Sequence, residues 1–176
     1  MSSYSAGLKG VTLALGFVAG AVSTAALSQG LVNRPQMSAA LANELVGDTV
    51  AICAKQGYKV WAQVVNMDGT RIALLRGDGA PMHSQDNSYY KAYSAASITL
   101  GRNEGSTKEV FDRMAKSPAS TVPTTQLPYV TYGQGGITIK AGGQPIGAIG
   151  VSGAPGGQYD EACAREALAK IQDRLK

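Results

Sequence analysis

The sequence has very little histidine and cysteine, and this shortage excludes several kinds of site. Its 176 residues include one histidine, His83, and two cysteines, Cys53 and Cys163. A serine triad needs a histidine as general base, and His83 belongs to no G-x-S-x-G nucleophile elbow. One histidine and two distant cysteines also cannot supply the four ligands of a zinc site. We therefore identify no catalytic residue and expect no zinc.

Patterns that bind phosphate or nucleic acid are missing as well. The glycine-rich stretches 133–136 and 153–157 have neither the spacing of a Walker loop nor that of a dinucleotide fingerprint. Sixteen Lys and Arg against twelve Asp and Glu give a net charge of +4, but no basic run alternates with aromatic residues. We expect no nucleic-acid partner.

The N-terminal part of the chain contains no charged residue between Lys9 and Arg34. Its apolar stretch 11–19 has the length of a signal-peptide core, and Ala26-Leu27-Ser28 is typical of a cleavage site. We predict a signal peptide over residues 1–28, a linker over 29–36, and export to the periplasm or the cell exterior. The alternative is a retained membrane anchor over residues 10–27, facing the periplasm, because this stretch reaches the lower length limit of a membrane span.

The stretch 135–154 predicts a β-hairpin. Ile137 and Ile139 alternate with polar residues, and after a glycine turn the return strand 146–151 is almost entirely apolar. A strand of that kind is typical of a sheet centre covered on both faces, whereas the alternating strand can leave one face exposed.

The remaining elements are predicted from caps and periodicity. We expect a helix after Ser38, a hairpin over 60–75 with a type I′ turn at Asp68-Gly69, and a helix from Ser84 or Asp86 to Leu100. A short helix follows the Ser106 capping box, and the last helix begins at a cap on Asp160. The order helix, hairpin, two helices, hairpin, helix predicts an α+β fold, with an antiparallel sheet built from two hairpins and helices packed on it.

Several blocks of the sequence together resemble the GlcG/HbpS-like family. They are the stretches 65–69, 76–84, 91–96 and 135–154, followed by Asp160-Glu161-Ala162-Cys163-Ala164. The resemblance covers residues 37 to 175, which places a GlcG/HbpS-like domain over 37–176. It implies a profilin-like α/β/α fold, frequent oligomers, and haem binding in some members, with no settled activity for many.

The resemblance directs attention to the loop 76–84. His83 precedes a predicted helix N-terminus, where backbone N–H groups and the guanidinium of Arg76 could hold carboxylates such as haem propionates. We predict a haem site that contains His83, Arg76 and Ser84, with His83 as the candidate ligand of the haem iron. Tyr90 and Tyr93 on the following helix are further candidates, because a phenolate also ligates haem. The simpler interpretation is that His83 is a surface residue and that the tyrosines pack on the sheet.

The resemblance also implies that Cys53 and Cys163 lie near one another, on the first and last helices. We predict that they form a disulfide in an oxidising compartment, with two buried thiols as the alternative. The apolar, tyrosine-containing segment 123–132 would need a partner surface if exposed, which favours a homo-oligomer or a place in a larger complex.

Three functions remain open. The first is an exported, non-enzymatic protein that binds haem or another small ligand. The second is an accessory or structural subunit anchored to a membrane complex through residues 10–27. The third is an enzyme acting on a small metabolite, which no sequence feature favours.

Overall fold

One antiparallel sheet of four strands, built from two hairpins, organises the domain. The computed structural model describes residues 30–116 and 126–176, of which 33 onwards belong to one unit. The strands follow the order β2-β1-β4-β3 across the sheet, so the hairpins meet where β1 pairs with β4. Their bounds are β1 (Trp61–Val65), β2 (Arg71–Arg76), β3 (Gly136–Ala141) and β4 (Gln144–Ser152). The predicted α+β fold with two hairpins is confirmed.

Strand β4 lies inside the sheet and is buried from Ile146 to Ser152, as its apolar sequence predicts. The expectation that β3 leaves one face open is wrong for its first four residues, which are all buried. Thr138, on the polar side of the alternation, lies under helix α2 (Ser84–Ala95), and its hydroxyl donates to the carbonyl oxygen of Ala95 at 2.6 Å. A hydroxyl can be buried there because its hydrogen bond is made within the protein.

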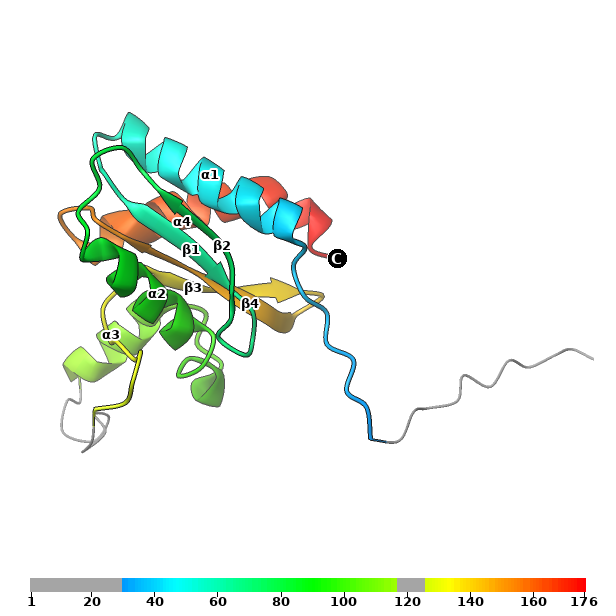
Figure 1. The fold of residues 1–176 in the computed structure, drawn as a ribbon. Helices are drawn as coiled ribbons and strands as arrows, with labels where there is room; N and C mark the ends of the chain where they lie inside the picture. The colour runs from blue at the N-terminus through cyan, green and yellow to red at the C-terminus, as the bar shows by residue number, and fades with distance from the viewer. Residues whose placement is uncertain (1–29, 117–125) are drawn as a thin grey trace, which may run out of the picture. The chain divides into compact units, whose positions relative to one another are not determined.

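Helices cover both faces of the sheet (Figure 1). On one face, α1 (Ala39–Lys55) and α4 (Gly157–Ile171) enclose the larger core, which includes Leu45, Ile149 and Ile171. On the other face lie α2 and α3 (Thr107–Lys116), above a smaller core of alanines and valine. Two short 3₁₀ helices complete the described elements, η1 (Leu100–Arg102) and η3 (Gln172–Arg174).

Helix α1 begins and ends where its sequence predicts. The hydroxyl of Ser38 accepts a hydrogen bond from the N–H of Leu41 at 3.2 Å, and Gly57 has the left-handed backbone (φ +82°) that ends a helix. A disulfide between Cys53 and Cys163 connects α1 to α4, with 5.5 Å between the two Cα atoms. The two helices that open and close the domain are therefore cross-linked on the same face of the sheet.

Helix α2 is shorter than predicted, because it ends at Ala95 instead of Leu100. The hydroxyls of Ser97 and Thr99 donate to the carbonyl oxygens of Tyr93 and Ala95. In a continuing helix, these carbonyl oxygens would accept from backbone N–H groups four residues later. The predicted caps at Ser84 and Asp86 are also wrong. His83 occupies the N-cap position and its side chain makes no capping hydrogen bond.

Two further local predictions are corrected. A type I′ turn needs a positive φ at both central residues, but only Gly69 has one, and the carboxamide oxygen of Asn66 instead accepts from the N–H groups of Asp68 and Thr70. Asp160 does not cap α4, because the helix begins three residues earlier, after the N-cap Gly156. The carboxylate of Asp160 is buried in the first turn.

The predicted signal or anchor segment, residues 1–28, lies outside the described residues, as does much of the coil 117–128. In the part of the chain that the structure describes, no helix combines the length and the apolar character that crossing a membrane requires.

Candidate functional site

The structure places His83 on the surface at the start of α2, where its side chain is exposed. It does not line the pocket of about 450 Å³ to which Arg76 belongs, and the side chain of Arg76 is bound to the loop between the two residues. The guanidinium of Arg76 donates to the carbonyl oxygen of Ala80 at 2.7 and 3.1 Å and lies 5.4 Å from the ring centre of Trp61. The guanidinium of Arg76 therefore stabilises the loop 76–84 by hydrogen bonds within that loop.

Ser84 is buried at the first position of α2, and its hydroxyl has no hydrogen-bond partner among the described residues. Ser84, like His83, lines none of the described pockets. The three residues predicted from the loop are thus neighbours in sequence without a shared cavity, and their role in haem binding stays a prediction.

The predicted tyrosines lie in a cluster that the sequence indicated only in part. Tyr89, Tyr90 and Tyr93 project from α2, and Tyr129 packs against all three, with ring centres 5.6, 5.9 and 5.8 Å away. We call these four residues the tyrosine cluster. Several of the pairs are tilted or edge-to-face, which are favourable geometries for aromatic rings.

Tyr129 reaches the cluster because its backbone is held in an unusual conformation. Its φ is +62°, in the left-handed region that residues with a Cβ rarely adopt. The segment is fastened to α2 two residues later, where the N–H of Thr131 donates to the hydroxyl of Ser94 at 2.8 Å. Strained backbone of this kind is often found at ligand sites, where surrounding contacts maintain it.

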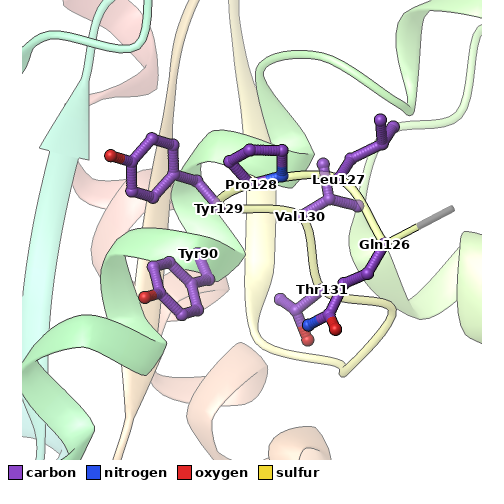
Figure 2. Close-up of a pocket in the computed structure, with 7 residues that line it drawn as sticks. All are labelled: Tyr90, Gln126, Leu127, Pro128, Tyr129, Val130 and Thr131. Atoms are coloured by element: carbon purple, nitrogen blue, oxygen red, sulfur yellow. The ribbon is translucent and has the colours of Figure 1, made fainter.

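Tyr90 and Tyr129 line a pocket of about 540 Å³ (Figure 2). Their rings stand beside one another, and both hydroxyl groups point to the same side, away from Gln126 and Leu127. The remaining lining comes from the segment 126–131, which is apolar at Leu127, Pro128 and Val130. The pocket is therefore bounded by two tyrosine rings and an apolar wall, and the two phenol oxygens point away from that wall.

Arg71 adds a positive charge beside the tyrosine cluster. Its guanidinium carbon lies 3.7 Å from the ring centre of Tyr89, a cation–π contact, and its Nε donates to the side chain of Gln63 at 2.9 Å. Sequence reasoning missed Arg71, because its contact with Tyr89 depends on how α2 packs on the sheet. Tyr129 was noted only as part of a partner surface, although the run Tyr129-Val130-Thr131-Tyr132 was its signal.

A second polar centre lies on the other side of α2, where Lys91 and Asp160 form a buried ion pair. The Nζ atom of Lys91 lies 2.7 Å from Oδ2 of Asp160, and the side chains are 6% and 2% exposed. Burial raises the pKa of Asp160 above its ordinary value, and the nearby ammonium of Lys91 only partly opposes this. No described residues form a group of three or more potential metal ligands from His, Cys, Asp and Glu.

Comparison with known proteins gives one consistent result. The family described as "Haem degrading protein HbpS-like" matches residues 37–169. A crystal structure of HbpS is 30% identical, with a TM-score of 0.69, over 81% of this chain and 94% of that chain. A double mutant of HbpS from Streptomyces reticuli is also 30% identical, with a TM-score of 0.70, over 86% of this chain and 98% of that one.

Two more distant structures share the fold. The protein ORFY of Klebsiella pneumoniae is 28% identical, with a TM-score of 0.66, over 81% of this chain and 97% of that chain. A complex of PduOC with haem is 22% identical, with a TM-score of 0.66, over 78% of this chain and 96% of that one. No curated protein matches the chain. Because the family match spans most of the sequence and includes all four strands and most of the helices, the chain belongs to the HbpS-like family.

Proposed function

We propose that this chain is a haem-binding protein that works in an oxidising compartment outside the cytoplasm, and that the pocket beside the tyrosine cluster takes the haem. The observation that carries the proposal is the placement of the Tyr90 and Tyr129 phenols side by side at one pocket, with ring centres 5.9 Å apart. The family's description names haem, and PduOC, a protein of the same fold, was solved with haem bound. Both facts support haem as the ligand.

The residues of the pocket fit the chemistry of haem. A phenolate oxygen is an established axial ligand of haem iron, and two phenols are available at the pocket. Leu127, Pro128 and Val130 offer apolar contact to a porphyrin, and Arg71 is the cation near the cluster that could pair with a propionate. When bound, haem would supply a redox-active iron. The protein's part is to hold it, with Tyr90 or Tyr129 as ligand and Tyr89 and Tyr93 as the packed support.

The test is a hemin titration that follows the Soret band of the full chain. The double variant Tyr90→Phe, Tyr129→Phe keeps the rings but removes both phenol oxygens, so we expect the Soret maximum to shift and the affinity to fall by about tenfold or more. Tyr132→Phe is the matched control, because Tyr132 lies in the same segment but does not line this pocket.

The alternative haem position in the loop 76–84 is tested by His83→Ala and Arg76→Ala. If histidine is the ligand, His83→Ala shifts the Soret maximum, while Arg76→Ala weakens binding with little spectral change, because a propionate contact lies outside the iron's first shell. If the haem lies in the tyrosine pocket instead, both variants bind hemin like the wild type. A wild-type chain that binds hemin no better than a control protein would refute the function itself.

Export is supported by the disulfide between Cys53 and Cys163, because such bonds persist in oxidising compartments. We propose that residues 1–28 are removed during export and that the mature protein is periplasmic or extracellular. Intact-mass measurement of protein taken from its native host tests this. A mature chain that still begins at Met1 and fractionates with membranes would favour the anchored-subunit alternative.

A further inference from the structure

The buried pair of Lys91 and Asp160 has an unused hydrogen-bond donor. An ammonium group carries three N–H donors. Those of Lys91 reach Oδ2 of Asp160 at 2.7 Å and the carbonyl oxygen of Val151 at 2.9 Å, and no third acceptor is found among the described residues. The carboxylate of Asp160 also accepts from the N–H of Ala154 at 3.0 Å. A charge this deeply buried is costly unless its hydrogen bonds are completed.

Lys91 forms part of the lining of a pocket of about 370 Å³ that opens between α2, α3 and the start of α4. The carboxamide oxygen of Gln134, which also lines it, is buried and has no hydrogen-bond partner among the described residues. The other lining residues are Asn87, Phe111, Gly133, Gly157 and Gln158. Two residues that line this pocket thus carry a buried ammonium with a spare N–H and a buried oxygen without a partner, a combination that favours a polar ligand beside them.

An apolar groove of about 380 Å³ adjoins this polar pocket, since the two share Phe111 and Gly133. Its other lining residues are Met114, Ala115 and Tyr132. Phe111 is 46% exposed, so its ring offers apolar area between the two spaces. A ligand that filled both would have a polar head at Lys91 and an apolar tail beyond Phe111.

We propose that this two-part groove binds a small amphipathic organic acid that carries an N–H or O–H donor next to its carboxylate, as an N-acyl amino acid does. The carboxylate accepts the third N–H of Lys91, the donor meets the unpaired oxygen of Gln134, and the tail lies along Phe111 and Met114. Gly157 and Gln158, which also line the pocket, are the first residues of α4, where backbone N–H groups have no partner within the helix. The site is separate from the tyrosine pocket, because Tyr90 and Lys91 line different pockets from adjacent positions on α2.

The first experiment is calorimetric titration of the full chain with N-octanoylglycine. Three comparison compounds each lack one recognised feature: N-octanoylglycinamide lacks the carboxylate, octanoate lacks the N–H, and N-acetylglycine lacks the tail. We expect N-octanoylglycine to bind about tenfold more tightly than the first and third compounds, and about fivefold more tightly than octanoate, since one hydrogen bond is worth about 1 kcal/mol. Equal binding of the acid and its neutral amide would overturn the proposal, as would the absence of saturable binding.

Variants locate the site. Phe111→Glu places a negative charge at the junction of pocket and groove, so affinity for N-octanoylglycine should fall by about tenfold or more. Leu100→Glu is the matched control, because Leu100 is similarly exposed at 41% and lines neither space. Gln134→Leu should reduce affinity about fivefold and abolish the preference over octanoate. If Phe111→Glu binds like Leu100→Glu, the groove is not the site.

The head group is tested by the double variant Lys91→Met, Asp160→Asn, which removes both charges and leaves no buried charge alone. We expect it to bind N-octanoylglycine no better than the neutral amide. Should this variant fail to fold, Phe111→Glu and Gln134→Leu still decide the question. Displacement of N-octanoylglycine by stoichiometric hemin would show that haem occupies this groove and would refute the separate site, whereas independent binding of both supports it.

Discussion

The carbonyl oxygen of Ser88 occupies the space that a side chain at position 150 would need. A Cβ atom built on Gly150 lies 2.1 Å from Ser88 O and 2.4 Å from the N atom of Ala92, both in the backbone of α2. Because backbone atoms cannot move aside as a flexible side chain can, α2 rests directly on β4 at this glycine. Lys91 and three of the four residues of the tyrosine cluster (Tyr89, Tyr90 and Tyr93) are carried by this helix, so the contact helps to position both candidate sites.

We expect Gly150→Ala to lower the free energy of unfolding by about 3 kcal/mol or more, because the added methyl group pushes α2 off the sheet. The measurement is urea unfolding followed by the fluorescence of Trp61, the single tryptophan. Gly47→Ala is the control: a Cβ at Gly47 meets nothing within 4 Å, and alanine inside α1 should add about 0.5 to 1 kcal/mol. Equal stability of the two variants would contradict the close packing of α2.

The disulfide should contribute substantially to stability. Cys53 and Cys163 are 110 residues apart in sequence, and the chain-entropy model gives about 4.7 kcal/mol for a loop of about this length, an upper figure that native strain reduces. We expect reduction of the disulfide to lower the urea midpoint of unfolding.

The disulfide should also be present in the cell. Protein isolated from its native compartment, denatured without reductant and treated with a maleimide, should show no label. Labelling of both thiols would mean that the pair is reduced in the cell.

Asp160 should make stability depend on acid pH in an unusual direction. Burial raises its folded-state pKa above the unfolded value of 3.8, so the folded protein holds this proton more tightly. The contribution of Asp160 to stability is therefore complete below pH 3.8 and declines as the pH rises through the folded pKa, by up to about 1.4 kcal/mol per pH unit. Urea unfolding of the wild type and of the double variant Lys91→Met, Asp160→Asn is compared across this window. As the pH rises, the free energy of unfolding of the wild type should fall relative to that of the variant. Movement in favour of the wild type would mean that Lys91 outweighs burial.

The exposed segment around Leu127 should lie against another protein surface. Leu127 and Tyr129 are large hydrophobic residues that are both exposed, and they line the same pocket on either side of Pro128. We expect light scattering of the full chain to give a mass above the 18.1 kDa of one chain, or a partner to co-purify. Leu127→Glu should reduce that mass, whereas Leu100→Glu should not. A monomer at tens of micromolar, with no co-purifying partner, would exclude an interface at this segment.

The sequence predicted the architecture well because its signals are local. The alternation of Ile137 with Thr138, the capping hydroxyl of Ser38 and the apolar run of β4 each act within a few residues, and each predicted its element correctly. The end of α2 was missed because a serine or threonine hydroxyl can bond either to water or to a backbone carbonyl of the preceding turn. The sequence does not show which of these Ser97 and Thr99 do. Only the fold decides between them.

The candidate sites could be predicted less well, because they join distant residues. Lys91 and Asp160 are 69 residues apart, and nothing in either local sequence indicates the partner. Tyr90 and Tyr93 were selected from their position on α2, but Tyr129 reaches them through a left-handed backbone that no common sequence pattern predicts at tyrosine. His83 stood out by its rarity, and rarity carries no information about burial.

The pairing of β1 with β4 constrains how the chain can fold during synthesis. Each hairpin closes over a few residues, but Trp61 meets Ser152 only after nearly the whole domain has been made. Until then one edge of β1 has no strand beside it, and its unpaired N–H and C=O groups can join another chain. A nascent chain that stops before β4 therefore keeps an unpaired edge on β1. Pairing with another chain at this edge is blocked only after the final hairpin has formed.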